Sequence, residues 1–279
     1  MKEYKDIIFK SVEGHGLGMD IFVPDEKNPP LIMWIHGGGW NELNKNWYDL
    51  IAPMLSRGYA VATVDYRYSD EAPFPAQMLD LKDALLFIKK NGSRYGYDAS
   101  KIAVSGDSAG GHLCSMMGVS VGNADWERPG EDYSLQAVVV FNGPSYFTFP
   151  QRKSGQGEDE INPIELLLGA PADTKAGKIR AAAASPLTYI DGTEPPFLII
   201  HGTDDDIVDP VHARKLRNAL EEAGSTAMMY YVPGGEHGMM SPIINDVICE
   251  FLDYYLKGRK TVIRPELQSH HWRTLPKRA

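Results

Sequence analysis

A serine surrounded by small residues is the first sign of chemistry in this sequence. Ser108 lies in the stretch GDSAGG, which matches the pattern G-x-S-x-G. This pattern is typical of a nucleophile on a sharp turn between a strand and a helix, because larger neighbouring side chains would clash there. An apolar run precedes Ser108 and a helical pattern follows it, which favours that interpretation. A glycine-rich turn without function would show the same five residues.

The sequence offers a base for this serine further along the chain. A serine hydroxyl is a weak nucleophile until a base takes its proton. His237 follows an apolar run and lies in the glycine turn PGGEHG. The order serine, acid, histidine is the one expected of α/β-hydrolases. We therefore predict that His237 accepts the proton of Ser108.

The acid that would orient this histidine has several candidates in one loop. The stretch HGTDDDIVDP contains Asp204, Asp205, Asp206 and Asp209. One buried carboxylate is needed to hold the histidine tautomer and to stabilise the imidazolium. The distance from the preceding strand favours Asp205, with Asp206 and Asp209 as alternatives. No calcium loop is indicated, because the pattern D-x-[DN]-x-[DN]-G is absent.

A third segment could stabilise negative charge. HGGGW (residues 36–40) follows an apolar run, and its consecutive glycines allow close approach of backbone N–H groups to a ligand. Such a segment forms half of an oxyanion hole, which the N–H after the nucleophile completes, here that of Ala109. We interpret His36 as an anchor of the loop. Trp40, Tyr146 and Phe147 are candidates for the wall of a substrate pocket.

The elements that must position these residues alternate along the chain. The runs at 31–36, 58–66, 101–105, 136–141, 197–201 and 227–232 read as buried strands, and those at 73–96, 109–121, 210–223 and 242–257 as helices. This alternation predicts one α/β domain over residues 1–260, with a mostly parallel, doubly wound, eight-stranded sheet. An N-terminal hairpin at 4–10 and 17–23 precedes it. Residues 145–190 interrupt the pattern as a small cap, and 261–279 form a tail that is either docked or disordered.

Composition narrows the function classes. The chain has 279 residues, 43% of them hydrophobic, and its 28 basic against 37 acidic side chains give a net charge of −9. An acidic chain without a basic stripe is a poor candidate for nucleic acid or an anionic membrane. No apolar run reaches the roughly 20 residues of a membrane span, so we expect a soluble protein, cytoplasmic or secreted without its leader. The histidines show no metal-binding pattern, so neither a metal nor a cofactor is expected.

The combination of segments resembles a known family. HGGGW, DYRYSDEAPFPAQMLDLKDALLFIKKN, SGDSAGGHL, HGTDDDIVD and PGGEHG are similar to the α/β-hydrolase esterases related to hormone-sensitive lipase. The likeness is greatest to the bacterial branch with acetylxylan and feruloyl esterase-like enzymes, and it covers about residues 15–257 in order. It implies an α/β-hydrolase fold and a serine carboxylesterase that needs no cofactor.

The resemblance also implies roles for single residues. It makes Ser108 the nucleophile, Asp205 the acid, His237 the base, and Gly38, Gly39 and Ala109 the oxyanion hole. Gly37 stays open as a further donor. One departure concerns the acid loop, because Val208 is followed by Asp209 and only then by Pro210. The short, polar cap argues against a lipase for long acyl chains.

The expected partner is a small-molecule ester or an acylated oligosaccharide, with a homodimer left open. Acetyl or hydroxycinnamoyl esters of plant carbohydrates are one candidate substrate class. A serine peptidase or amidase on the same fold is the alternative enzyme. A noncatalytic binding protein is the alternative from another class, although such proteins commonly lose a member of the Ser–His–Asp set.

Overall fold

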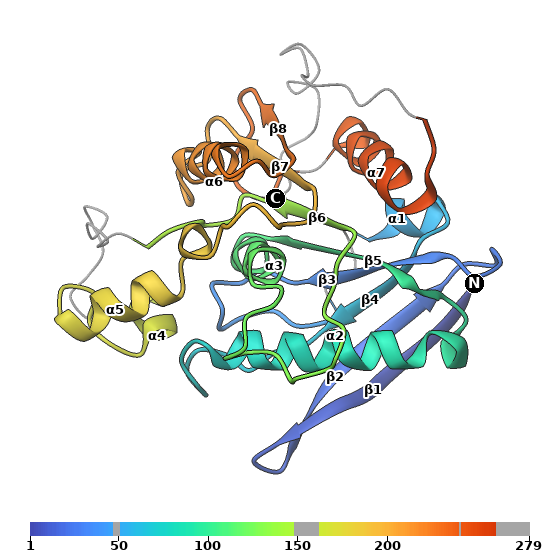
Figure 1. Ribbon diagram of the computed structural model, residues 1–279, viewed down its shortest axis with the longest axis horizontal. Helices are drawn as coiled ribbons and strands as arrows, with labels where there is room; N and C mark the ends of the chain where they lie inside the picture. The colour runs from blue at the N-terminus through green and yellow to red at the C-terminus, as the bar shows by residue number, and fades with distance from the viewer. Residues whose placement is uncertain (47–50, 148–161, 240, 261–279) are drawn as a thin grey trace, which may run out of the picture.

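Eight strands form a single sheet in the computed structural model, which describes residues 1–46, 51–147, 162–239 and 241–260 (Figure 1). The strands are β1 (Lys2–Val12), β2 (His15–Val23), β3 (Pro30–Ile35), β4 (Ala60–Val64), β5 (Asp98–Asp107), β6 (Ala137–Phe141), β7 (Phe197–Gly202) and β8 (Ala227–Val232). The helices are α1 (Ala52–Ser56), α2 (Ala76–Tyr95), α3 (Ala109–Val119), α4 (Pro163–Leu168), α5 (Lys175–Ala183), α6 (Val211–Glu222) and α7 (Pro242–Lys257), with a 3₁₀ turn at Pro186–Thr188.

The strand order is β1-β2-β4-β3-β5-β6-β7-β8. β1 and β2 form an antiparallel hairpin, and β2 also pairs antiparallel with β4, whereas the strands from β3 to β8 run parallel. The predicted α/β fold with a mostly parallel sheet and an N-terminal hairpin is thus confirmed. β5 begins earlier than predicted, because Asp98 already pairs with Pro30 ahead of a register shift.

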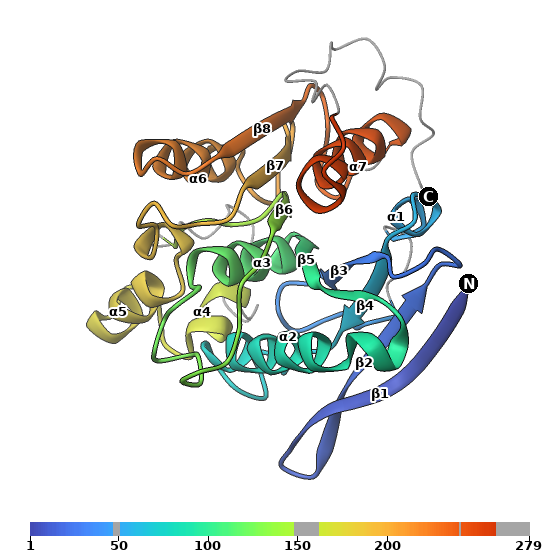
Figure 2. The same cartoon turned by 45° about the vertical axis from the view of Figure 1, so that its right-hand side comes forward.

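Side chains of the central strands point alternately to two helical layers. On β3, Leu31, Met33 and Ile35 belong to the core beneath α2, α3 and α6, whereas Ile32 and Trp34 belong to the core beneath α1 and α7. Figure 2 shows α2 and α3 on one side of the sheet and α1 and α7 on the other. A strand buried on both faces needs an unbroken apolar run, which is the pattern of a parallel sheet between helices.

The helix predicted over residues 73–96 is α2, and its apolar stripe is buried as expected. Met78, Leu81, Leu85 and Ile88 are all inaccessible to solvent. The helix ends at Tyr95, and the φ of 94° at the following Gly96 is the left-handed conformation common after a helix C-terminus.

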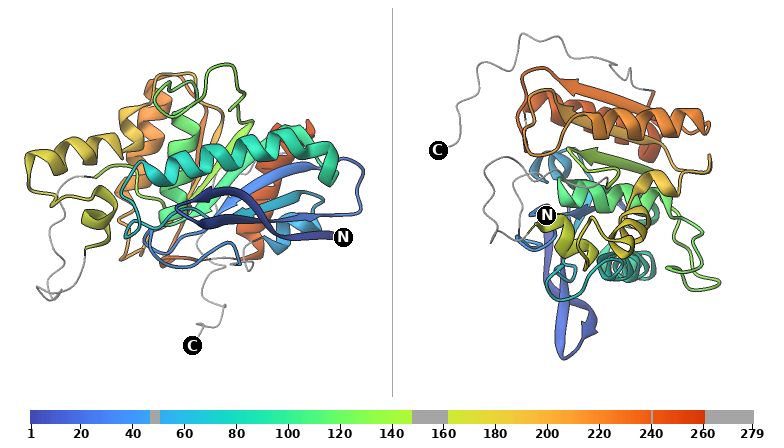
Figure 3. Two further views of the ribbon diagram at one scale, coloured as in Figure 1. Left: turned by 90° about the horizontal axis from the view of Figure 1, so that it is seen from below. Right: turned by 90° about the vertical axis from the view of Figure 1, so that its left-hand side faces the viewer.

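Between β6 and β7 the described chain forms α4 and α5, which lie together at one end of the molecule (Figures 1 and 3). The Arg180 guanidinium on α5 donates to the carbonyls of Leu168 and Gly169 at the end of α4. The Phe74 amide, just before α2, donates to the Leu167 carbonyl (2.8 Å). The bonds of Arg180 join α5 to α4, and the Phe74 bond ties this interrupting segment to the chain that leads into α2. Part of the predicted cap (148–161) and the tail (261–279) lie outside the described residues.

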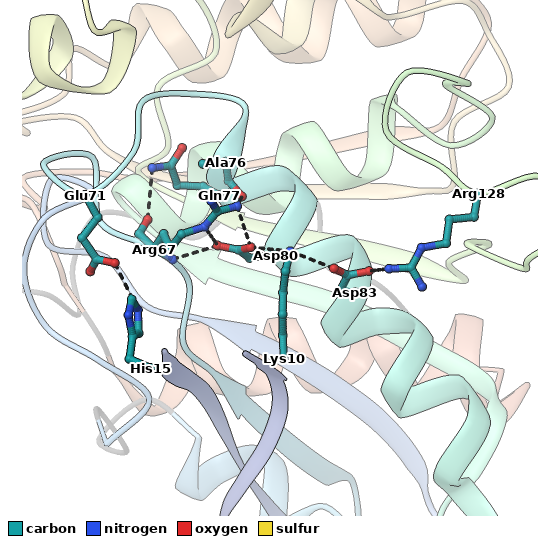
Figure 4. A network of polar contacts seen from close by, with 9 residues as sticks. All are labelled: Lys10, His15, Arg67, Glu71, Ala76, Gln77, Asp80, Asp83 and Arg128. Atoms are coloured by element: carbon teal, nitrogen blue, oxygen red, sulfur yellow. Dashed lines mark hydrogen bonds and ion pairs between the residues drawn. The ribbon is translucent and has the colours of Figure 1, made fainter. Parts of the chain in front are cut away.

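A buried ion cluster fixes the segment between β4 and α2 (Figure 4). The Asp80 side chain on α2 is fully buried and accepts from Arg67 Nε (2.8 Å), Arg67 Nη2 (2.9 Å) and Lys10 Nζ (2.7 Å). Lys10 also pairs with Asp83 (2.8 Å), which in turn contacts Arg128. The cluster joins β1, the segment after β4 and α2. Buried charges are tolerable only when they are paired in this way.

Replacement of Arg67 by methionine should destabilise the fold strongly. Arg67→Met leaves the buried Asp80 carboxylate with Lys10 as its remaining cation of this cluster and with the backbone N–H of residue 67. Breaking a buried ion pair costs about 3–5 kcal/mol. We expect a loss of that order in the free energy of urea unfolding. The control is Arg217→Met, since Arg217 pairs with Glu221 on the exposed face of α6 and should lose under about 1 kcal/mol. Equal losses in the two variants would contradict the role given to the cluster.

Candidate active site

Ser108 lies on the turn between β5 and α3 in a strained backbone conformation. Its φ of 52° and ψ of −117° are rare for a residue with a side chain, and such conformations cost about 1–3 kcal/mol. Its N–H donates to the Phe141 carbonyl on β6 (2.9 Å). A Cβ on Gly106 would lie 2.4 Å from the Gly110 carbonyl oxygen, and one on Gly110 would lie 2.1 Å from that of Ile35. Only glycine fits these two positions.

Three side chains predicted from the sequence meet at this turn. Ser108 Oγ lies 2.9 Å from His237 Nε2, and His237 Nδ1 lies 2.8 Å from Asp205 Oδ2. The three residues follow β5, β8 and β7, at the carboxyl ends of parallel strands, where ligands bind in open α/β sheets. The arrangement is a hydrogen-bonded row of hydroxyl, imidazole and carboxylate. It can deprotonate the serine hydroxyl when the serine attacks a carbonyl carbon.

The Asp205 carboxylate is buried and fully surrounded by donors. Its Oδ1 accepts from the amides of Ile207 and Val208 (2.9 Å each), and its Oδ2 accepts from His237 and lies 3.2 Å from His201 Nε2. Burial alone would raise the pKa of Asp205. The hydrogen bonds from His201, His237 and the Val208 amide outweigh this effect and hold its pKa well below the usual range. Asp205 is therefore an anion whenever His237 works as a base.

The alternative acids have other surroundings. Asp204, Asp206 and Asp209 are exposed, whereas Asp205 is buried. Asp204 accepts from the Thr203 hydroxyl (2.9 Å), and Asp209 accepts from the Val211 amide (2.8 Å) at the start of α6. The geometry thus favours Asp205 among the four. Asp209, which precedes the proline in this loop, therefore accepts a hydrogen bond at the start of α6.

The loops that carry the acid and the histidine are locked together. The Asp204 amide donates to the Gly235 carbonyl (2.9 Å), and the Gly234 amide donates to the Thr203 hydroxyl (2.7 Å). A Cβ on Gly202 would lie 2.2 Å from the Gly235 carbonyl oxygen, so glycine is needed for this approach. The contact fixes the distance between the loop after β7 and the loop after β8.

The glycine loop after β3 reaches the same edge of the sheet. Gly38 and Gly39 have positive φ values of 91° and 56°, and Trp40, at 66°, does too. The Gly38 carbonyl accepts from the amide of Glu42 (2.9 Å), which closes the loop. Tyr66, which stacks on the His36 ring at 4.4 Å, donates its hydroxyl to the His36 carbonyl (3.0 Å). His36 is thus an internal support of the loop, in line with its interpretation as an anchor.

Ala109 and Gly37 lie where the loop meets the serine turn. Ala109 is the first residue of α3, so its N–H belongs to the first turn of a helix, whose amides have no acceptor within the helix. Gly37 is buried beside the last residue of β5. Pro163 at the start of α4 lies 3.7 Å from where a Cβ on Gly39 would stand. The interrupting segment therefore borders the glycine loop.

The proposed pocket residues differ in how far they are exposed. Trp40 is buried, and its indole N–H donates to His112 Nδ1 (3.0 Å), while Phe147 packs edge-on against the Trp40 ring and is also buried. Tyr146 is half-buried between the His212 ring (4.4 Å) and the Lys215 ammonium group (3.9 Å). Their contact with a substrate stays a prediction.

Several supporting residues do not follow from sequence reasoning alone. His112 uses both ring nitrogens: its Nδ1 accepts from Trp40, and its Nε2 lies 2.7 Å from the Ala184 carbonyl. It thereby joins the glycine loop to the end of α5. In the sequence, His201 is recognisable only as the last residue of an apolar strand, four residues before the acid. No pattern in the sequence predicts the role of Tyr66.

Within the residues that the structure describes, no group of three or more His, Cys, Asp or Glu side chains could hold a metal ion. None of the helices in those ranges has the length and apolar character to cross a membrane.

Comparison with known proteins places the chain in a family. The BD-FAE family model matches residues 19–220, which include the glycine loop, Ser108 and Asp205. The chain belongs to the BD-FAE family. Its relatives among curated proteins include a Mycobacterium tuberculosis protein named "Probable carboxylic ester hydrolase LipM", 31% identical over 72% of this chain and 47% of the relative. The chain spans about half the length of the first curated relatives it matches.

Solved structures add a close likeness in fold. One is described as "Truncated form of carbohydrate esterase from gut microbiota", with a TM-score of 0.81 and 28% identity over 92% of this chain and 97% of that one. Another is described as "Bifunctional GH43-CE Bacteroides eggerthii", with a TM-score of 0.80 and 29% identity over 91% of this chain and 35% of that one. The BD-FAE chain therefore has the α/β-hydrolase fold of esterases, as the sequence resemblance predicted.

A methyl group at Gly110 should disrupt the serine turn. Gly110→Ala places a Cβ 2.1 Å from the Ile35 carbonyl oxygen, so α3 must move away from β3 and carry the turn with it. We expect the rate of the reaction at Ser108 to fall by about 100-fold or more, since an error of about 1 Å in position can cost that much. Gly122→Ala is the control, because a Cβ there meets no atom within 4 Å. Gly122 has φ of 87°, so that variant loses about 1–2 kcal/mol of stability but keeps its rate. Full activity of Gly110→Ala would contradict this account.

Buried neutral histidines should make the fold sensitive to acid. Burial lowers the pKa of His36, His112 and His212 to about 4 each. In the unfolded chain a histidine has a pKa near 6.5, so between about pH 6.5 and 4 the unfolded state binds more protons than the folded state. Stability should therefore fall as the pH drops through that window, by up to about 3 kcal/mol for each histidine.

Urea midpoints measured from pH 7 to pH 4.5 test this expectation. His36→Phe keeps a ring against Tyr66 and removes one titrating group, so its midpoint should fall less steeply than that of the unmodified protein. His15→Gln is the control, since the His15 side chain is half exposed and pairs with Glu71 at the surface. A slope that stays the same in His36→Phe would show that His36 does not contribute.

Proposed function

We propose that this BD-FAE family member is a serine carboxylesterase that hydrolyses short-chain acyl esters through an acyl-serine intermediate. The observation that carries the proposal is the continuous row from Ser108 Oγ through His237 to the buried Asp205 carboxylate, on a strand–helix turn. The esterase names of its relatives support the same reaction class.

In the proposed reaction, His237 Nε2 takes the Ser108 hydroxyl proton as Oγ bonds to the ester carbonyl carbon. The tetrahedral intermediate then breaks its bond to the alcohol oxygen, which receives the proton from His237. A water molecule, deprotonated by His237, attacks the acyl-serine. The second intermediate then breaks its bond to Oγ and releases the carboxylic acid, and His237 returns the proton to Oγ, which restores the Ser108 hydroxyl. Asp205 stays ionised and holds Nδ1 protonated throughout.

The negative charge of each tetrahedral intermediate needs donors that are already in place. We assign this role to the backbone N–H groups of Gly38, Gly39 and Ala109, which come from the glycine loop and the start of α3. Donors fixed before the reaction stabilise the transition state without reorganisation, and loss of one typically costs about 10²–10³ in rate. The adjacent N-terminus of α3 favours the same charge.

The natural substrate that we favour is an acetyl or hydroxycinnamoyl ester of a plant carbohydrate. Two structural neighbours support this class, because one is described as a carbohydrate esterase and the other as a bifunctional GH43-CE protein. Within this class, the approach of Pro163 to Gly39 argues for the acetyl ester over the bulkier hydroxycinnamoyl ester, since it places the start of α4 directly beside the proposed oxyanion hole. Tyr146, half-buried beside His212 and Lys215, is the aromatic candidate for the wall of the substrate pocket.

Two other functions compete with this one. A serine peptidase or amidase would use the same row of side chains on an amide carbonyl. A noncatalytic binding protein would have no need for the strained serine or for the buried carboxylate that pairs with His237. The intact hydrogen-bonded row therefore favours an enzyme, and substrate assays separate the esterase from the amidase.

Ser108→Ala should abolish ester hydrolysis. We expect the unmodified protein to cleave p-nitrophenyl acetate and butyrate faster than the decanoate. The Ser108→Ala variant should lose at least about 10³-fold in kcat, because this variant lacks the nucleophile. Ser105→Ala is a matched control from the same strand, since Ser105 is fully buried and should keep its rate within a few-fold. Acetylated and feruloylated xylan oligomers, assayed beside peptide amides, identify the natural class.

Each outcome of that panel separates the candidates. Turnover of esters by Ser108→Ala equal to that of the unmodified protein would overturn the serine mechanism. Cleavage of amides alone would favour the peptidase, and no turnover of any substrate would favour the binding protein. A preference for the decanoate would contradict the small acyl pocket.

A further inference from the structure

One carboxylate at the centre of the site has no part in the proposed reaction. Asp107, the last residue of β5, directly precedes Ser108. Its Oδ1 atom is buried, and no described residue donates a hydrogen bond to it. A buried carboxylate oxygen without a partner costs free energy, since charged groups are strongly solvated in water. Such an atom beside a nucleophile calls for a functional reason.

The other side of this carboxylate is pressed against the glycine loop. A Cβ on Gly37 would lie 2.9 Å from Asp107 Oδ2 and 3.0 Å from the Asp107 carbonyl oxygen. Glycine alone permits this approach, and the neighbouring Gly37 N–H lowers the pKa of the carboxyl group. The carbonyl of Gly37 is held as well, since His36 Nδ1 lies 2.9 Å and the Tyr66 hydroxyl 3.3 Å from it. Gly37 is therefore held through its carbonyl and packed against the Asp107 carboxylate.

We propose that Asp107 is a positioning residue that acts through Gly37 to hold the oxyanion loop beside Ser108. In this proposal the Gly37 N–H donates a hydrogen bond to the Asp107 carboxylate, which the close approach of the two residues allows. Because Asp107 and Ser108 are consecutive, this bond ties the loop to the turn that carries the nucleophile. Gly38 and Gly39 follow Gly37 directly. The position of Gly37 therefore sets where their N–H groups lie relative to Ser108. The proposal deepens the proposed function and rests on it.

The electrostatic surroundings are consistent with this role. Burial raises the pKa of the Asp107 carboxyl to about 6, while the N–H groups of Asp107 and Gly37 and the charge of His237 lower it. The other titratable groups that sense its charge are Tyr66 and Cys114, both buried. An ionised Asp107 receives a charge-assisted hydrogen bond from Gly37, which is stronger than a neutral one.

Three variants separate the hydrogen bond from the charge. Asp107→Asn keeps an oxygen that accepts from Gly37 and removes the charge, whereas Asp107→Ala removes both. Gly37→Ala leaves Asp107 in place but puts a methyl group where the carboxylate lies. Asp253→Asn, which changes another buried carboxylate at the far end of α7, controls for general destabilisation.

We expect Asp107→Ala and Gly37→Ala to lower kcat on p-nitrophenyl acetate by about 10- to 100-fold, with KM within about three-fold, because oxyanion contacts form in the transition state. A trifluoromethyl ketone, which forms a hemiketal oxyanion on serine, should lose affinity by a similar factor. Asp107→Asn should keep kcat within about five-fold of the unmodified protein. Asp253→Asn should lower the melting temperature and leave kcat unchanged.

A readout without turnover keeps this proposal separate from the esterase assignment. Hydrogen–deuterium exchange of the peptide that covers residues 36–42 should speed up in Asp107→Ala and stay unchanged in Asp107→Asn. Unaltered exchange and kcat in Asp107→Ala would overturn the proposal while the esterase stands. An equal loss in Asp107→Asn and Asp107→Ala would also overturn it, because charge rather than the hydrogen bond would then matter. If Asp107→Ala does not fold, full kcat in Gly37→Ala has the same meaning.

Discussion

The strained turn at Ser108 is the constraint on which the rest of the site depends. With φ at 52° the serine side chain stands clear of both β5 and α3, and this is possible only because α3 approaches β3 closely enough for Gly110 to touch the Ile35 carbonyl. A strained residue persists only where its surroundings over-determine it. Here they do so through the Phe141 carbonyl, which accepts from the serine N–H, and through the glycines on either side.

The order of strands supplies the partners of this turn. β5 lies between β3 and β6, so the glycine loop after β3 arrives from one side, and the loops after β7 and β8 arrive from the other with the acid and the histidine. Parallel strands end at one edge, which brings together residues 36, 108, 205 and 237 despite their distance in the sequence. Contacts between these loops, such as that between Gly202 and Gly235, then fix their relative positions. The side chains of Ser108, His237 and Asp205 can therefore form one hydrogen-bonded row.

Sequence patterns predicted two kinds of feature: residues whose type already implies a chemical role, and helices or strands with a strong periodicity of apolar residues. The apolar runs of β3 and β7, the stripe on α2, and the row of Ser108, Asp205 and His237 are of these kinds. The supports around them are not, because each depends on a contact between segments far apart in the chain. Tyr66, just after β4, donates to the His36 carbonyl at the end of the neighbouring strand β3, and His112 binds both Trp40 and the carbonyl of Ala184. A single residue type does not reveal such partners, and strand ends such as that of β5 depend on register.

Asp80, which is buried, and Asp107, which is half-buried with one buried oxygen, show how stability and function divide the polar interior. Asp80 has both oxygens paired, with Arg67 and Lys10, and its cluster joins three elements away from the reacting groups. Asp107 has one oxygen beside Gly37 and another without a described partner, and it stands next to the nucleophile. A fold that only maximised stability would complete or remove the second carboxylate, because each unpaired buried group is costly. Asp107 lies between the glycine loop and the serine turn. There its unpaired oxygen is a cost in stability that function can compensate, because a loop amide that approaches the turn needs an acceptor.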